Sequence, residues 1–110
     1  MDEETDFKVT PMEKKNLKGP RLREEDRLLM AIDPETREAL RLGETPAERG
    51  PAFFTSVEAL EAYCEEAGLE HLEPYEVPAP VLTRMAGQPF WLDGERGSVD
   101  EAARRLSRRR

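Results

Sequence analysis

Residues 53–68, Phe-Phe-Thr-Ser-Val-Glu-Ala-Leu-Glu-Ala-Tyr-Cys-Glu-Glu-Ala-Gly, read as a short buried strand that runs into a capped amphipathic helix. The hydroxyl of Thr55 can accept from a free backbone N–H of the first turn, and Glu58 stands three residues later to complete a capping box. Gly68 supplies the left-handed residue at which such a helix ends. Apolar residues recur at helical spacing while glutamates take the other side, so we expect the helix to pack against the two phenylalanines.

Residues 27–32, which precede this unit, form an apolar run of the length of a buried strand. The next segment, 33–43, allows two interpretations. Asp33-Pro34 followed by an acid is typical of a helix start, and Gly43 is a natural stop. The alternation over 39–42 instead favours a hairpin turn at 33–37 and a second strand. Helix propensity favours the first interpretation and topology favours the second.

The chain after Gly68 predicts a further series of short elements. They are an irregular edge strand over 69–77 that contains Pro74, a short helix from Pro80, a strand over 89–92, a turn at Asp93-Gly94 and a helix capped by Ser98 and Glu101. Together the elements predict an α/β or α+β fold, with a small mixed sheet of three to five strands and two to four helices.

Length and composition limit the organisation of the chain. Its 110 residues correspond to one domain, over 22–107, with a polar N-terminal arm over 1–21 and a basic tail over 104–110. No stretch has the length of a membrane span, and the first residues are acidic where a secretory signal would be basic, so we expect a cytoplasmic protein. Single Asn, Gln and Cys residues beside abundant Glu and Arg are a bias of thermophilic proteins, and also of GC-rich genomes.

The run from Leu28 to Leu106, and chiefly residues 51–60, Pro-Ala-Phe-Phe-Thr-Ser-Val-Glu-Ala-Leu, resembles the N-terminal domain of the SseB family. Members of that family carry an apolar strand, a hairpin, an FTS-x-EAL strand-to-helix junction and a later strand–turn–helix. The family's usual Val-Pro-Val strand is replaced here by Leu-Leu-Met-Ala-Ile. The resemblance implies a small α/β fold, a hairpin at 33–43, no established enzymatic activity and a role in protein interaction.

Candidate catalytic and metal-binding residues are few. His71 is the only histidine and Cys64 the only cysteine, seven residues apart. A metal site needs several converging ligands, and Glu70 and His71 point to opposite faces if their backbone is extended. We therefore assign no catalytic residue, metal ligand or cofactor. A small enzyme with a site near Cys64 and His71 remains an alternative, which a core position for Cys64 and an open position for His71 would contradict.

Positive charge is concentrated at the C-terminus. Five arginines stand within the last seven residues: Arg104, Arg105, Arg108, Arg109 and Arg110. Such a tail can bind the phosphates of a nucleic acid, or it can pair with acidic groups of its own chain or of a partner. Because the rest of the chain is acidic and has no basic platform with interleaved aromatic residues, we favour pairing with acidic groups and keep nucleic acid as the alternative.

Two pairs of adjacent aromatic residues, at 53–54 and 90–91, place rings on both faces of their strands. The second face must be covered by helices on both sides of the sheet or by a second copy of the chain. Trp91, Tyr75 and Phe90 are accordingly the candidate interface residues, because large aromatics dominate binding hot spots. The sequence thus predicts a non-enzymatic domain that acts through protein contacts and forms a homodimer.

Overall fold

The computed structural model describes residues 21–85 and 87–109. Its strands are β1 (Arg27–Ile32), β2 (Arg41–Leu42), β3 (Gly50–Phe53), β4 (Glu73–Pro78), β5 (Trp91–Leu92) and β6 (Glu95–Arg96). Its helices are α2 (Val57–Ala67), the 3-10 helix η2 (Ala79–Met85) and α3 (Val99–Arg109). The α+β fold is confirmed. The structure has six short strands, where three to five were predicted. Apart from Arg21, the predicted N-terminal arm lies outside the described residues.

The strands form two ladders that meet at β1. One ladder is the antiparallel pair β1 and β4, and the other has the order β2-β3-β5-β6, in which β3 and β5 are parallel. The second edge of β1 joins the two, because Leu29 and Phe54 exchange backbone hydrogen bonds of 2.9 and 2.8 Å. β1 is therefore the central strand of the fold, as its apolar sequence predicts.

The segment 33–43 forms a hairpin turn followed by β2, which is one of the two interpretations of the sequence. The Asp33 carboxylate accepts from the backbone N–H of Glu35 at 2.8 Å and of Thr36 at 3.3 Å. Leu40 then donates its N–H to the carbonyl of Ala31 at 2.8 Å, so the chain returns along β1. Asp33 thus caps a turn with the hydrogen bonds that it would make at the start of a helix.

Helix α2 begins one residue later than predicted. Its N-cap is Ser56, whose hydroxyl accepts from the N–H of Ala59 at 3.1 Å, so the predicted Thr55 cap is wrong. The capping box with Glu58 is wrong as well, because the Thr55 N–H donates to the Asp93 carboxylate at 2.8 Å. The predicted stop is confirmed, since Gly68 is left-handed with a φ of 73° and its N–H bonds to the last carbonyls of the helix.

Strand β4 lies at the edge of its ladder, and both of its prolines face away from β1. Ala79 donates its N–H to the carbonyl of Asp26 at 3.0 Å, which continues the ladder beyond the end of β4. Because antiparallel hydrogen bonding alternates along a strand, the odd-numbered residues bond to β1. Pro74 and Pro78 therefore occupy the outer side, where the missing N–H breaks no bond with β1, and the predicted edge strand is confirmed.

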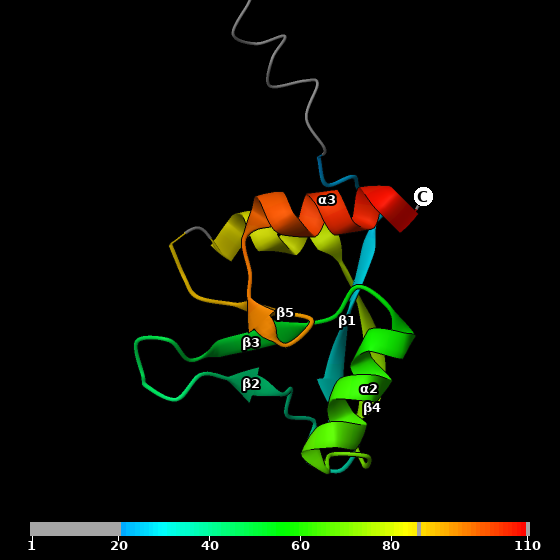
Figure 1. Cartoon of the computed structure of the whole chain (residues 1–110), viewed down its shortest axis with the longest axis vertical. Coiled ribbons are helices and arrows are strands. Elements are labelled where there is room, and N and C mark those ends of the chain that lie inside the picture. The colour runs from blue at the N-terminus through cyan, green and yellow to red at the C-terminus, as the bar shows by residue number, and fades with distance from the viewer. Residues whose placement is uncertain (1–20, 86, 110) are drawn as a thin grey trace, which may run out of the picture.

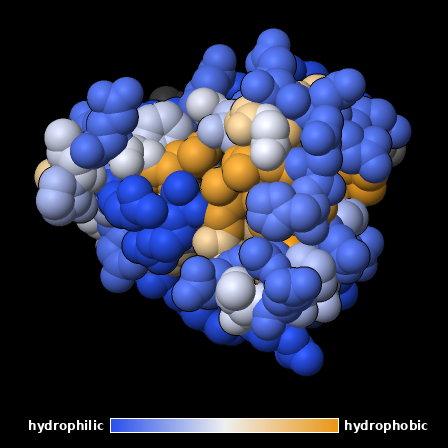
Figure 2. Space-filling model, turned by 90° about the horizontal axis from the view of Figure 1, so that it is seen from below, coloured by the Kyte–Doolittle hydropathy of each residue, from blue (hydrophilic) through white to orange (hydrophobic). Residues whose placement is uncertain are grey.

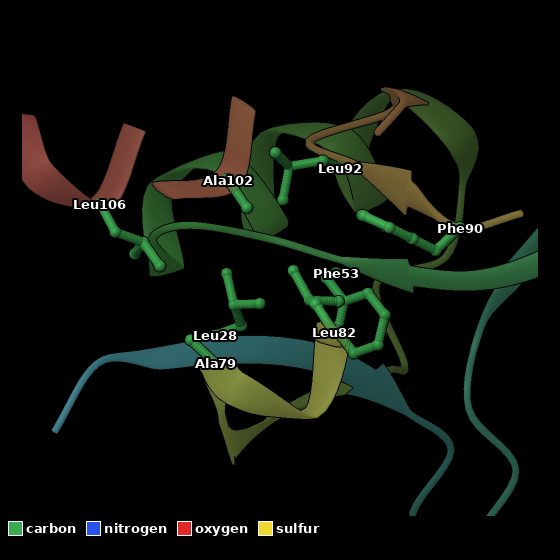
Figure 3. Packing of buried hydrophobic residues seen from close by; sticks show 8 residues of the cluster. All are labelled: Leu28, Phe53, Ala79, Leu82, Phe90, Leu92, Ala102 and Leu106. Atoms are coloured by element: carbon green, nitrogen blue, oxygen red, sulfur yellow. The ribbon is translucent and has the colours of Figure 1, made fainter. Parts of the chain in front are cut away.

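The phenylalanines at the end of β3 face opposite sides of the sheet and begin two separate cores. Phe53 belongs to the first core cluster, to which both η2 and α3 contribute side chains; Figure 1 shows the two helices at the same end of the molecule, and Figure 3 shows the cluster between them. The buried members of this cluster are Leu28, Phe53, Ala79, Leu82, Phe90, Leu92, Ala102 and Leu106. Phe53 and Phe90 meet edge to face, with their ring centroids 6.0 Å apart.

Phe54 belongs to the second core cluster, on the side covered by α2. Its buried members are Ala31, Ala52, Phe54, Leu60 and Cys64. The Phe54 ring is fully buried and lies 5.7 Å from the ring of Tyr63. The expected packing of this helix is thus confirmed for Phe54 and wrong for Phe53, which faces the first core cluster. Both faces of β3 are covered by helices of the same chain. Phe53 and Phe54 consequently give no reason to invoke a second copy.

Candidate functional site

Cys64 and His71 do not form a catalytic pair. Cys64 is 4% exposed within the second core cluster, and burial raises the pKa of its thiol. The His71 side chain is 60% exposed, with its Nε2 3.7 Å from the carboxylate of Asp33. This is the arrangement that contradicts a site at these two residues. Within residues 21–85 and 87–109, no three His, Cys, Asp or Glu side chains are grouped as metal ligands.

We expect Cys64 to react slowly while the protein is folded. Alkylation requires both the thiolate and access to the sulfur, and burial opposes both, so iodoacetamide should modify Cys64 about 100-fold more slowly than a free cysteine. Mass spectrometry at timed intervals measures the rate, and the same protein in denaturant is the control. Equal rates with and without denaturant would contradict a core position for Cys64.

The predicted basic tail is largely the last part of α3, which continues to Arg109 and buries Leu106 in the first core cluster. The guanidinium of Arg105 lies 3.0 Å from Asp93, 2.8 Å from Glu101 and 3.4 Å from Glu95. Arg104 binds the same Glu101 at 2.8 Å. These two arginines therefore pair with acids of their own chain. Deleting residues 104–110 would also remove Leu106, so this truncation is no clean test of nucleic-acid binding.

Asp93 is the centre of this network. It occupies the hairpin turn between β5 and β6 with a φ of 52°, and Gly94 follows with a φ of 90°, as expected for an Asp-Gly turn. Its carboxylate accepts from the Thr55 N–H at 2.8 Å, from the Thr55 hydroxyl at 2.9 Å and from Arg105. The network joins the start of α2 to the middle of α3 and has a structural role.

Glu101 supports this network from the first turn of α3. The Ser98 hydroxyl accepts from its backbone N–H at 3.1 Å, so the predicted cap at Ser98 is confirmed. Its carboxylate does not return to Ser98 but binds the two arginines, and side-chain hydrogen bonds from Arg104 and Arg105 lower the pKa of Glu101. The hydrogen bond that Arg105 donates to Glu101 likewise raises the pKa of Arg105.

The acidic residues between positions 50 and 83 are not offset within that span, because it contains no lysine or arginine. This span has seven glutamates: Glu58, Glu61, Glu65, Glu66, Glu70, Glu73 and Glu76. All seven are exposed on α2, on β4 or on the turn between them. None of their carboxylates forms an ion pair with a residue in the part of the chain that the structure describes. The α3 end is thus neutralised internally, whereas the α2 side is not.

A groove, here called the α2 groove, lies between this helix and the start of β4. It has a volume of about 310 Å³ and combines an apolar floor with three acidic side chains. Its lining residues are Leu60, Glu61, Cys64, Glu65, Glu70, Leu72 and Pro74. Figure 2, viewed from below Figure 1, shows a band of apolar surface enclosed by hydrophilic side chains. Leu69 and Leu72 are half-buried and pack against the second core cluster.

The three predicted interface residues have different environments. Phe90 is 5% exposed in the first core cluster, so it is not available to a partner and that prediction is wrong. Tyr75 is 46% exposed on β4. Trp91 is half-buried, and its indole N–H donates to the carbonyl of Glu48 at 3.0 Å. Of the three residues, only Tyr75 and Trp91 therefore reach the surface.

Comparisons with known proteins do not extend these observations. The chain matches no protein-family model, and neither the curated proteins nor the solved structures contain a significant match. The resemblance to the SseB family therefore remains a prediction from the residues of 51–60. Among the described helices, none has the length and apolar composition needed to cross a membrane.

Proposed function

We propose that this protein is a non-enzymatic interaction domain that binds a basic segment of a protein partner in the α2 groove. The observation that carries the proposal is the set of seven exposed glutamates that have no ion-pair partner among the described residues. Like charges so close together repel one another and destabilise the folded chain. A cationic partner removes that repulsion, and complementary charge also speeds its encounter with this side of the molecule.

The groove supports a partner segment that has both apolar and basic residues. Its floor, with Leu60, Leu72 and Pro74, can cover one apolar side chain. Glu61 and Glu65 stand one helical turn apart on its rim, so they can pair with two cations that flank that side chain. The expected ligand is therefore a short segment with a central Leu, Ile, Met or Phe between lysines or arginines.

Selection from a random library of displayed 12-residue peptides tests this proposal. The full chain should enrich peptides of this pattern. Their dissociation constants should be about 10–100 μM and should increase as the salt concentration rises. The double variant Glu61→Lys/Glu65→Lys should weaken the selected peptides by about tenfold, because two attractions become repulsions. Fluorescence anisotropy of labelled peptides measures both affinities.

A matched control is Glu24→Lys/Glu35→Lys, which makes the same change in net charge at exposed positions outside the α2 groove. The control should retain the affinity of the unmodified chain within about twofold. Equal weakening by both double variants would indicate attraction by net charge alone and would contradict a site in the groove. Enrichment of acidic or purely apolar peptides would contradict it as well.

A further inference from the structure

A second hollow, here called the Trp91 pocket, shares no residue with the α2 groove. Its volume is about 350 Å³, and it is lined by two aromatic residues, two glutamates, two glycines and one leucine: Trp91, Tyr63, Glu44, Glu48, Gly43, Gly94 and Leu42. No lysine or arginine lines it. The pocket is formed by the end of β2 with the loop that follows it, by β5 with its turn to β6, and by α2, three segments that are distant in the sequence.

Hydrogen bonds hold the wall of the Trp91 pocket in place. The indole N–H of Trp91 donates to the Glu48 carbonyl at 3.0 Å, which fixes the ring against the loop. Within the loop, the Thr45 carbonyl accepts from the N–H groups of Glu48 and Arg49, both at 3.0 Å. Gly43 closes the loop, because a Cβ at this position would lie 2.6 Å from the Glu48 carbonyl oxygen. The pocket is therefore preorganised before any ligand arrives.

The groups in this wall are those that recognise an organic cation. The face of an aromatic ring attracts ammonium and guanidinium groups, tryptophan most strongly. The chain already uses Trp91 in this way, since the guanidinium carbon of Arg96 lies 5.9 Å from the ring centroid. Arg96 does not line the pocket, and neither Glu44 nor Glu48 has an ion-pair partner among residues 21–85 and 87–109.

We infer that the Trp91 pocket binds the side chain of a lysine or arginine. The aromatic rings would cover its alkyl chain and attract its charge, while Glu44 and Glu48 would pair with it at the mouth. This inference rests on the proposed function in one respect only, namely that the cation belongs to a protein partner. The pocket itself is defined by residues outside the α2 groove, so each proposal can fail without the other.

Trp91 is the only tryptophan of the chain, so its fluorescence reports on the pocket directly. The probe is the acetylated and amidated peptide Gly-Gly-Lys-Gly-Gly, titrated into the full chain at constant ionic strength. We expect a saturable change in emission with a dissociation constant of about 1–20 mM, in the range of a single cation–aromatic contact supported by carboxylates. The arginine analogue should behave in the same way, and the norleucine analogue should give no saturable change.

Variants separate the pocket from general attraction to an acidic protein. The double variant Glu44→Gln/Glu48→Gln should lower the affinity for the lysine peptide about fivefold, because it removes both carboxylates. The control, Glu58→Gln/Glu66→Gln, removes two exposed charges of α2 that do not line the pocket, and should leave the affinity within about twofold. Equal weakening by both pairs, or no response to any cation, would overturn the inference.

Two further arms fix the position and source of the cation. Arg96→Gln should leave the affinity within about twofold, whereas an increase of about fivefold would place the ligand at the Arg96 position and overturn the pocket. Choline tests a small free cation. Saturable binding of choline without binding of the lysine peptide would overturn a protein side chain as the ligand. Peptide selection at the α2 groove is unaffected by any of these outcomes.

Discussion

Replacing Phe54 by alanine is expected to reduce the free energy of unfolding by about 3–5 kcal/mol, the largest effect of any change considered. The Phe54 side chain is fully buried, packs against Tyr63 and begins the second core cluster. Truncation loses the favourable free energy of burying the ring and leaves a cavity between β3 and α2. The cavity cannot collapse fully, because the backbone hydrogen bonds between Phe54 and Leu29 hold the strand in place. Urea denaturation followed by circular dichroism measures the change.

The matched control is Val57→Ala at the start of α2. Val57 is 42% exposed, so the same kind of truncation should change the free energy of unfolding by no more than about 0.5 kcal/mol. A domain of this size has a total stability of about 5–10 kcal/mol, so Phe54→Ala should also lower the thermal midpoint by well over ten degrees. A loss below about 1 kcal/mol for Phe54→Ala would show that α2 and β3 do not share a core.

Replacing Asp93 by alanine is expected to reduce the free energy of unfolding by about 2–4 kcal/mol. The variant leaves the Thr55 N–H and hydroxyl without their acceptor, removes one partner of Arg105 and places alanine at a positive φ. Asp93→Asn should cost less, about 1–2 kcal/mol, because the amide oxygen can still accept from Thr55 and asparagine tolerates this backbone conformation. Denaturation curves of the two variants measure the difference.

The role of charge in this network can be separated by a double-mutant cycle with Arg105→Leu. The costs of Asp93→Asn and Arg105→Leu should not add, because both remove the ion pair of 3.0 Å. Additive costs would contradict coupling between the β5–β6 turn and α3.

Acid should weaken the same network. Because hydrogen bonds from Arg104 and Arg105 lower the pKa of Glu101, its contribution is present at neutral pH. The contribution is lost as the pH falls below the ordinary glutamate range and through that lowered pKa.

Much of the fold follows from local signals in the sequence. Gly68 ends α2, Ser98 begins α3 and Asp93-Gly94 forms a turn, because each depends on hydrogen bonds within a few residues of itself. The strand at β1 is equally visible from its apolar residues. In these places the interacting residues are close together in the sequence, so they can be predicted without knowledge of the rest of the chain.

The remaining features depend on distant partners. Asp33 accepts the same hydrogen bonds in a turn as in a helix start, and only the pairing of Leu40 with Ala31 selects the turn. By local sequence, Thr55 and Ser56 are equally suitable N-caps. Ser56 is the N-cap in the structure because Thr55 donates its N–H and its hydroxyl to the carboxylate of Asp93, 38 residues away. Local preference therefore cannot decide either case.

The Trp91 pocket cannot be predicted from the sequence, although Trp91 is one of the predicted interface residues. Its wall joins Glu48 to an indole 43 residues later, and no spacing in the sequence indicates that contact. The α2 groove gave a weaker but visible signal, since seven glutamates without an intervening lysine or arginine can be read directly from residues 50–83. Only the folded chain shows that three of these glutamates, Glu61, Glu65 and Glu70, line a groove.

Growth of the sheet past β4 is restrained by the two prolines that face away from β1. Along that side only Glu76 retains an N–H, so an approaching chain could receive one main-chain donor where a regular strand would offer three. The exposed charge of Glu76 adds a further obstacle to stacking. The molecule thereby keeps an open strand at its margin without offering a template for fibrous aggregation, and a binding partner must recognise side chains instead of extending the sheet.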